Sequence, residues 1–379
     1  MDIKLTEEQK ILRSTIREFA GNEILPRATE LDRSGKFPYD LVRKCADLNL
    51  MGVAIPEQWG GGGMDYVSYC IAVEEVSRCC GSTGVILSVN NSLVCDPLLE
   101  FGNDDQKERF LKPLAKGDKI GCFALTEPEA GSDAGNQKST AVVDGNEYVL
   151  NGQKIFITNG EAADTVIVFM MTDKSKGVKG ITAFIVEKGT PGFSLGQKDD
   201  KLGINASGTA ELLFEDCRIP VEQRLGNESE GFKIAMKTLD GGRIGIAAQA
   251  VGIAQAALNE AIKYGRERKQ FGKPIGSFQA ISFMIADMAT EIDAARLLTY
   301  RAAYTKDSGK RYSMEAAMAK LFASETAMKA TTKGIQIHGG YGYMKDFPME
   351  RFFRDAKITE IYEGTSEIQR IVIASSILR

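Results

Sequence analysis

The sequence predicts an α+β multidomain protein, with a helical domain, an antiparallel β domain and a four-helix bundle in that order. Helical periodicity dominates residues 1–120, β-rich runs dominate residues 121–228, and long helical patterns return in residues 229–379. A chain of 379 residues is long for one hydrophobic core, which by itself favours two or three domains.

The first segment carries a clear helix-start signal. Thr6 and Gln9 form a capping-box pair, and an apolar stripe follows it. The stripe consists of Ile11, Leu12, Ile16, Phe19 and Ala20. Farther on, the run of glycines in Trp59–Gly63 interrupts the helical pattern. These glycines match no phosphate-binding spacing, so a close approach to a ligand phosphate and a flexible connection between helices both remain open.

The middle segment reads as a series of short strands. Asp144-Gly145 and Asn151-Gly152 are dipeptides typical of hairpin turns. The predicted strands cover residues 140–143, 148–150, 155–158, 165–171, 181–187 and 211–214. About a hundred residues are therefore expected to form the β domain.

The last segment predicts long helices over 231–264, 279–305 and 313–337, and a short C-terminal piece completes the bundle. The first of these helices is rich in glycine, at Gly241, Gly242, Gly245 and Gly252. Each glycine costs a helix interior roughly 1 kcal/mol relative to alanine. Either backbones pack closely here or a ligand lies against this face.

Composition excludes several classes of function. With 43% hydrophobic and 26% charged residues, the chain reads as soluble and globular. Its net charge of -4 and the lack of a Lys/Arg block argue against nucleic acid and against an anionic membrane surface. No apolar run reaches the roughly eighteen residues of a spanning helix, and the acidic start lacks a signal core. A cytoplasmic location without membrane insertion is expected.

The cysteines and the single histidine argue against a metal site. Seven cysteines without a Cys-x-x-Cys pair favour reduced, buried thiols over a disulfide framework or an iron-sulfur cluster. His338 alone cannot supply a multi-histidine metal site. The sequence also lacks a nicotinamide-binding Gly-x-Gly-x-x-Gly and a phosphate-binding P-loop.

A turn near the C-terminus carries the strongest catalytic candidate. Glu363-Gly364 comes just before Ser366 and Gln369, a Ser-x-x-Gln capping box that starts a helix. A carboxylate at such a turn can project into a cavity beside the free N–H groups of the helix start. The alternative is a run of solvated charges in which Glu367 pairs with Arg370. This stretch alone favours the alternative.

Five segments together resemble the acyl-CoA dehydrogenase family, above all its short-chain or butyryl-CoA branch. This branch includes bacterial enoyl-CoA reductases that work with electron-transferring flavoprotein. The segments are Thr126–Asp133, Phe156–Thr158, Arg268–Gly272, Gln336–Gly340 and Ile361–Ser366. The resemblance covers essentially the whole chain. It implies FAD as cofactor, an acyl-CoA or enoyl-CoA substrate, electron-transferring flavoprotein as partner, and a homotetramer built as a dimer of dimers.

The resemblance also implies a set of binding residues. The expected FAD contacts are Phe123, Leu125, Thr126, Gly131, Ser132, Phe156, Ile157, Thr158, Thr365 and Glu367, with Arg268, Gln270, Phe271, Gln279, Gln336, Gly339 and Gly340 reaching the FAD of a neighbouring subunit. The expected substrate contacts are Ser132, Asp240, Arg243 and Gly364. Taken alone, Phe156 would be a core residue and Asp240–Arg243 a plain salt bridge. Glu129 is expected to face solvent, because a carboxylate near phosphates would repel them.

Glu363 is expected to be the catalytic base. By resemblance, Gly242 occupies the place where isovaleryl-type and long-chain members carry their glutamate, and glycine cannot perform acid–base chemistry. Removing hydrogen across Cα and Cβ of a thioester requires a base, a hydride acceptor and donors to the thioester oxygen. Since no side chain accepts hydride, a flavin is required. Burial should raise the pKa of Glu363 toward neutrality.

The expected reaction is FAD-dependent interconversion of a short-chain acyl-CoA and its trans-2-enoyl-CoA. The segment Asn90–Leu99, which by resemblance lines the far end of the acyl pocket, departs from familiar short-chain members at Cys95 and Asp96. A larger or aryl-substituted enoyl-CoA, such as caffeyl-CoA, is therefore an alternative. A non-catalytic binding protein and a flavin oxidase or monooxygenase are rival classes. Electrons are expected to pass through electron-transferring flavoprotein, without direct reduction by NADH.

Overall fold

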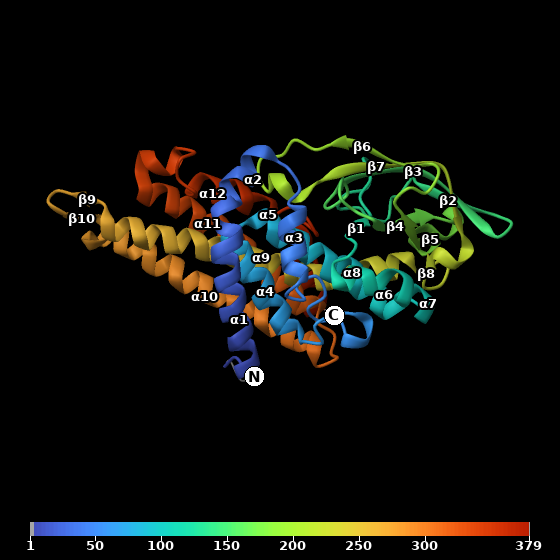
Figure 1. Ribbon diagram of the computed structural model, residues 1–379, viewed down its shortest axis with the longest axis horizontal. Coiled ribbons are helices and arrows are strands. Elements are labelled where there is room, and N and C mark those ends of the chain that lie inside the picture. The colour runs from blue at the N-terminus through green and yellow to red at the C-terminus, as the bar shows by residue number, and fades with distance from the viewer. Residues whose placement is uncertain (1–3, 379) are drawn as a thin grey trace.

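The computed structural model describes residues 4–378 and contains a helical N-terminal part, a β sheet and a set of long C-terminal helices (Figure 1). In this view the sheet lies on the right and the ends of the long helices point to the left. The predicted fold class is confirmed. The domain boundaries at residues 120/121 and 228/229 remain a prediction.

The N-terminal part consists of helices joined by short turns. They are α1 (Glu7–Phe19), α2 (Ala28–Ser34), α3 (Tyr39–Ala46), α4 (Tyr66–Cys79), α5 (Gly81–Ser88), α6 (Asp96–Phe101), α7 (Asp104–Gln106) and α8 (Lys112–Lys116). A π-helical segment, Val89–Cys95, joins α5 to α6. The capping box of Thr6 and Gln9 is confirmed at the start of α1. The apolar stripe is wrong at Ile11, whose side chain is 66% exposed.

The glycine run after Trp59 is a connection between helices. Gly61 packs so closely on the preceding turn that an added Cβ would lie 2.3 Å from the carbonyl oxygen of Ile55. Gly60 and Gly63 have positive φ angles, 82° and 64°, which glycine adopts without a steric penalty. The segment therefore needs glycine to form a tight turn that packs closely against the backbone of Gly52 and Ile55.

Within the described residues eight strands form one mixed sheet, in which seven follow the order β6-β7-β3-β2-β4-β5-β8 and β1 pairs with β4 outside this path. The strands are β1 (Gly121–Ala124), β2 (Thr140–Asp144), β3 (Glu147–Ile157), β4 (Thr165–Met171), β5 (Ile181–Glu187), β6 (Phe193–Lys198), β7 (Ala210–Pro220) and β8 (Arg224–Leu225). Most pairs are antiparallel, as predicted, but β4 runs parallel to both β1 and β2.

One of the two predicted hairpin turns is wrong. Asp144-Gly145 begins the turn between β2 and β3, whereas Asn151-Gly152 lies inside β3 at an irregularity in its pairing with β7. An added Cβ at Gly152 would lie 2.4 Å from the Cβ of Ser139. A β-bulge and a close approach of another strand both favour glycine, as a hairpin turn does. The Asn-Gly dipeptide alone therefore does not distinguish a bulge from a turn.

The C-terminal part is built on three long helices. They are α9 (Gly231–Glu267), α10 (Gln279–Asp307) and α11 (Ser313–His338), and α12 (Met349–Ile358) and α13 (Ser366–Ile377) follow. The short strands β9 (Lys269–Gln270) and β10 (Lys273–Pro274) form a hairpin at the tip between α9 and α10 (Figure 1). With 37 residues, α9 is about 55 Å long, and it connects the sheet to this tip.

The glycines of α9 allow neighbouring groups to approach its backbone. An added Cβ at Gly245 would lie 2.2 Å from the hydroxyl of Tyr69, and one at Gly252 would lie 2.4 Å from the carbonyl oxygen of Glu74, both on α4. At Gly242 it would lie 1.9 Å from the carboxylate Oε2 of Glu363. Close packing therefore explains the unusual glycine content, and at Gly242 the neighbour is the catalytic candidate itself.

No helix in residues 4–378 is both long enough and apolar enough to cross a membrane. All seven cysteines are free and buried. No cluster of metal-ligating side chains occurs in the same residues.

Candidate active site

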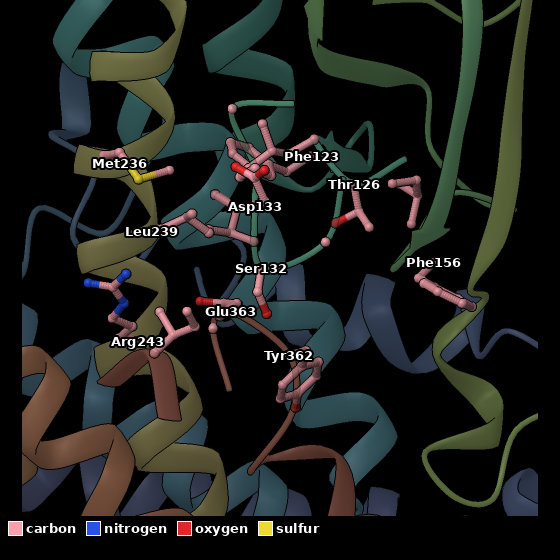
Figure 2. Close-up of a pocket in the computed structure, with 18 of the residues that line it drawn as sticks. Phe123, Thr126, Ser132, Asp133, Phe156, Met236, Leu239, Arg243, Tyr362 and Glu363 are labelled. Atoms are coloured by element: carbon pink, nitrogen blue, oxygen red, sulfur yellow. The ribbon is translucent and has the colours of Figure 1, made fainter. Parts of the chain in front are cut away.

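A cavity of about 310 Å³ lies between the sheet, α9 and the turn before α13 (Figure 2). It brings together many of the predicted site residues, although they are far apart in the sequence. Those on its wall are Phe123, Leu125, Thr126, Gly131, Ser132, Phe156, Ile157, Thr158, Arg243, Glu363 and Gly364.

Glu363 occupies a strained turn that several donors hold in place. Its φ is +53° and that of Gly364 is +94°. The amide Nε2 of Gln369 donates to the carbonyl oxygens of Glu363, at 3.2 Å, and of Gly364, at 2.8 Å. The Nζ of Lys320 donates to the carbonyl oxygen of Gly364 at 2.7 Å. A non-glycine residue with positive φ persists only where its surroundings over-determine it, and such residues cluster at functional sites.

The helix after this turn has its N-cap one residue earlier than predicted. Thr365 is the N-cap of α13, with its hydroxyl accepting from the N–H of Ile368 at 3.4 Å. The Ser366–Gln369 capping box is therefore wrong, because Gln369 instead directs its amide back to the turn. The general inference, a carboxylate on a turn ahead of a helix, is correct.

The carboxyl group of Glu363 is shielded from water. Its Oε2 atom is buried and has no hydrogen-bond partner among residues 4–378. Burial raises the pKa of Glu363 to about 8, against the opposing positive charges of Lys320 and Arg243. The solvated-charge alternative is thus wrong for this residue. Arg370 forms its ion pair with Glu325, at 2.5 Å.

Arg243 is the second charged group on the cavity wall. It is buried on α9, and its Nη1 donates to Oδ1 of Asp240 at 2.5 Å, while the hydroxyl of Ser313 donates to the other carboxylate oxygen at 2.5 Å. The salt bridge considered from the sequence is therefore present. Asp240 itself is not on the wall of the cavity, and the Nε of Arg243 is buried without a partner. Asp240 thus orients Arg243 and leaves one of its donors unused.

The loop Thr126–Asp133 is held from behind by a buried ion pair that the sequence analysis missed. Glu127 accepts from the backbone N–H groups of Lys138, at 2.5 Å, and Ser139, at 3.2 Å. The Nζ of Lys154 contacts its carboxylate at 2.7 Å and also donates to the carbonyl oxygen of Leu125 at 3.1 Å. Both partners are buried, and burial lowers the pKa of Lys154 to about 8. Glu129 is exposed, as expected.

Phe156 presents its ring to the cavity. Its side chain is 64% exposed and its φ is +58°, so the alternative of a core residue is wrong. Thr126, Ser132 and Thr158 add hydroxyl groups to the same wall, and in the view of Figure 2 Ser132 is drawn beside Glu363. A planar aromatic surface bordered by hydroxyl groups suits a large ring system with a polar edge.

A second group of predicted residues lies at the opposite end of α9. Arg268, Gln270, Gly339 and Gly340 line a shallow hollow of about 600 Å³, and Phe271 at the tip is 92% exposed. The structure does not bring this group to the cavity of the same protomer. His338 stacks on Tyr264 with ring centroids 4.3 Å apart, so its ring takes part in packing. The predicted residues outside both hollows are Asp240, Phe271, Gln279, Gln336, Thr365 and Glu367.

Several residues of the cavity wall were not predicted. They are Val89, Asp133, Ala134, Gly135, Val178, Phe232, Met236, Leu239, Tyr362 and Ile368. Leu93, also on the wall, belongs to the segment Asn90–Leu99 that was expected to line the pocket. The spacing of Met236, Leu239 and Arg243 on one face of α9 is a signal that could have found two of them. Tyr362 adjoins Glu363 and its hydroxyl donates to Oε1 of Gln249.

Comparison with known proteins agrees with this geometry. Family models for the N-terminal, middle and C-terminal domains of acyl-CoA dehydrogenases match residues 6–118, 122–217 and 229–378. The chain belongs to the acyl-CoA dehydrogenase family. As an acyl-CoA dehydrogenase it is an oxidoreductase and an FAD-dependent flavoprotein.

Individual relatives of this acyl-CoA dehydrogenase share its full length. The chain is 56% identical to the short-chain specific acyl-CoA dehydrogenase of Clostridium acetobutylicum, over all of both chains. It is 51% identical to the acryloyl-CoA reductase (NADH) of Anaerotignum propionicum, over all of this chain and 96% of the relative. A structure solved in a study of the electron transferring flavoprotein of Acidaminococcus fermentans superimposes with a TM-score of 0.99, at 54% identity over all of both chains.

The cavity fits the cofactor of the family. Its volume lies within the roughly 300–1,000 Å³ of small-molecule sites. The exposed ring of Phe156 can stack on a flavin ring, and the hydroxyls of Thr126 and Thr158 can bond its polar edge. The carboxyl group of Glu363 lies across the cavity from this aromatic wall (Figure 2). This leaves the space between them for a substrate.

Proposed function

We propose that this acyl-CoA dehydrogenase interconverts a short-chain acyl-CoA and its trans-2-enoyl-CoA, with Glu363 as the group that takes or returns the α-proton. The observation that carries the proposal is the buried Oε2 of Glu363, which has no hydrogen-bond partner and adjoins a cavity suited to FAD. A base whose pKa lies near neutrality is well matched to proton transfer at physiological pH.

The other wall residues bind and orient the substrate. Backbone N–H groups at the Glu363–Gly364 turn would donate to the thioester oxygen as negative charge develops there. Arg243 and Ser132 would hold the CoA part, and the apolar side chains of Leu239 and Tyr362 would exclude water from the acyl group. Bound FAD would supply hydride transfer at Cβ, which no amino-acid side chain can perform.

The geometry favours a short acyl chain over an aryl group. Within the segment Asn90–Leu99, Leu93 lines the cavity, whereas Cys95 and Asp96 do not. Asp96 instead accepts from the hydroxyl of Tyr66 and from the Nζ of Lys306, at 2.5 Å from the latter. Cys95 and Asp96, the two residues that differ from familiar short-chain members, thus lie behind the cavity wall. The short-chain specific relative adds support.

The test is anaerobic stopped-flow bleaching of the flavin in purified, FAD-loaded protein. Butyryl-CoA should reduce the flavin fastest among butyryl-, octanoyl- and aryl-propionyl-CoA, and crotonyl-CoA should reoxidise it. A clear maximum with octanoyl-CoA would reject the short-chain and the aryl versions alike. Rapid reoxidation in air would favour an oxidase, and no reduction by any acyl-CoA would favour a binding protein.

We expect the electrons to pass through electron-transferring flavoprotein, because the 54% identical chain comes from a study of such a protein. NADH alone should not bleach the flavin at a useful rate, since the sequence has no nicotinamide fingerprint. One relative is named acryloyl-CoA reductase (NADH), so direct reduction of the flavin by NADH is the result to look for. Such reduction would contradict this expectation. Addition of the cognate electron-transferring flavoprotein should couple NADH to enoyl-CoA reduction.

A cytoplasmic location is part of this proposal. Seven free, buried thiols suit a reducing compartment, in which disulfides do not persist.

We further propose a homotetramer in which the tip of α9 completes the FAD site of a neighbouring subunit. Phe271 is 92% exposed, and the guanidinium of Arg268 lies over Tyr341, 5.6 Å from the ring centroid. Arg268→Ala should therefore weaken FAD binding and tetramer formation together, because a ligand shared between subunits stabilises their assembly. Light scattering and flavin titration measure the two effects. The control is Lys188→Ala, which removes an exposed cation from the β domain. A monomer that retains its full flavin content would contradict this proposal.

A further inference from the structure

A lysine lies fully buried behind the catalytic turn. Lys320 on α11 is 0% exposed, and its Nζ donates to the carbonyl oxygen of Gly364 at 2.7 Å. In the part of the chain that the structure describes, this ammonium forms no salt bridge with a carboxylate. A buried charge without a paired counterion is costly, so its presence here calls for an explanation.

The position of Lys320 relates it to Glu363 in two ways. Its hydrogen bond reaches the residue directly after Glu363, so it restrains a backbone turn with positive φ at both positions. Its positive charge opposes the effect of burial on Glu363 and lowers the pKa of that carboxyl group. Glu363 in turn raises the pKa of Lys320, which burial nevertheless brings down to about 8.

We propose that Lys320 is a positioning residue of the reaction: it holds the Glu363–Gly364 turn through the Gly364 carbonyl, and its charge sets how readily Glu363 gives up its proton. The proposal rests on the proposed role of Glu363. It adds to that role a residue that lies off the cavity wall and acts through the turn.

Gln369 provides an internal comparison for the two effects. Its amide donates to the same Gly364 carbonyl, at 2.8 Å, and to the carbonyl of Glu363, at 3.2 Å. Gln369 is as deeply buried as Lys320 but carries no charge. Loss of Gln369 therefore removes a restraint on the turn alone, whereas loss of Lys320 removes a restraint and a charge.

The charged and titratable groups around Glu363 come from four elements. They are Lys320 on α11, Arg243 on α9, Tyr69 on α4 and the adjacent Tyr362. Glu360 and Glu367 act on Lys320 by raising its pKa. Burial raises the pKa values of both tyrosines, so these side chains stay neutral near pH 8. Lys320 and Arg243 are thus the cations that favour ionised Glu363, and removing Lys320 must move its titration to higher pH.

The experiment titrates Glu363 in FAD-loaded protein by infrared spectroscopy of the carboxylic acid C=O band, assigned by its loss in Glu363→Gln. Lys320→Met should raise the midpoint by about one to three pH units, the range expected for loss of a nearby opposite charge. Gln369→Leu should leave the midpoint nearly unchanged. The pH at which the rate of flavin reduction by butyryl-CoA falls off on the acidic side should rise by the same amount. At a fixed pH below this point, each unit of displacement should lower the rate about tenfold.

Lys320→Gln is the second variant, because it keeps a donor for the Gly364 carbonyl while removing the charge. It should give the same upward displacement and retain the turn if Lys320→Met does not fold. An unchanged midpoint in the folded Lys320 variants would overturn the proposal, as would equal displacements in Lys320→Met and Gln369→Leu. The infrared titration needs no turnover. If the wild-type protein failed to react with butyryl-CoA, the proposed function would be refuted, but the effect of Lys320 on the titration of Glu363 could still be measured.

Discussion

Glu363→Gln is expected to slow flavin reduction by butyryl-CoA about 10²- to 10⁴-fold, because the amide cannot accept the α-proton. Affinity for FAD and for CoA should persist, since glutamine has nearly the same shape and Gly242 leaves the same space beside it. Anaerobic stopped-flow bleaching measures the rate. The matched control is Glu325→Gln, which removes a surface carboxylate paired with Arg370 and should leave the rate unchanged. Near wild-type reduction in Glu363→Gln would end the assignment.

The same substitution should stabilise the folded protein in a pH-dependent way. The pKa of Glu363 rises from 4.5 to about 8 on burial, so the folded protein binds its proton more tightly than the unfolded chain does. The stability contributed by the protonated group is fully present below pH 4.5 and is lost as the pH rises through about 8. Glu363→Gln avoids this loss. Its Tm without substrate should exceed that of the wild type above pH 8, and the difference should shrink toward pH 4.5.

Glu127→Ala is expected to destabilise the protein by about 3–5 kcal/mol, because it leaves the buried ammonium of Lys154 without its partner. It also frees two backbone N–H groups, of Lys138 and Ser139, that Glu127 now accepts from. Urea unfolding of the FAD-free protein measures the loss. Flavin affinity should fall as well, because the loop on the cavity wall loses its support.

The control for Glu127 lies two residues along the same loop. Glu129→Gln replaces an exposed carboxylate and should change stability by less than about 0.5 kcal/mol. The double variant Glu127→Gln with Lys154→Met should recover much of the lost stability, since neither buried charge then remains. If Glu127→Ala unfolded at the same urea concentration as the wild type, the ion pair would have no structural importance.

The sequence was most informative where a local pattern decides the structure. Helix α1 begins at the capping box of Thr6, and β4 and β5 have the predicted bounds, because side-chain periodicity and cap chemistry act over a few residues. The position of Glu363 on a turn ahead of a helix follows from the same local logic. Its burial does not, since that depends on α9 and α11 packing around the turn.

Contacts between distant segments were beyond local reasoning. Glu127 and Lys154 belong to different parts of the β domain, and only the sheet places one against the other. Gly152 carries a turn signal, yet the long pairing of β3 with β7 converts it into an irregularity within a strand. No local pattern distinguishes Lys320 from the other polar residues of its long helix, whereas the fold buries it behind the Glu363–Gly364 turn.

The near-contact of Gly242 with Glu363 has a consequence for evolution within the family. An added Cβ at position 242 would already lie 1.9 Å from the carboxylate of Glu363, so the helix and the turn cannot both carry a glutamate side chain without rearrangement. An exchange of glutamate between positions 242 and 363 therefore needs two substitutions. Either substitution alone leaves two crowded carboxylates or none at this wall of the cavity, which is an obstacle to such an exchange.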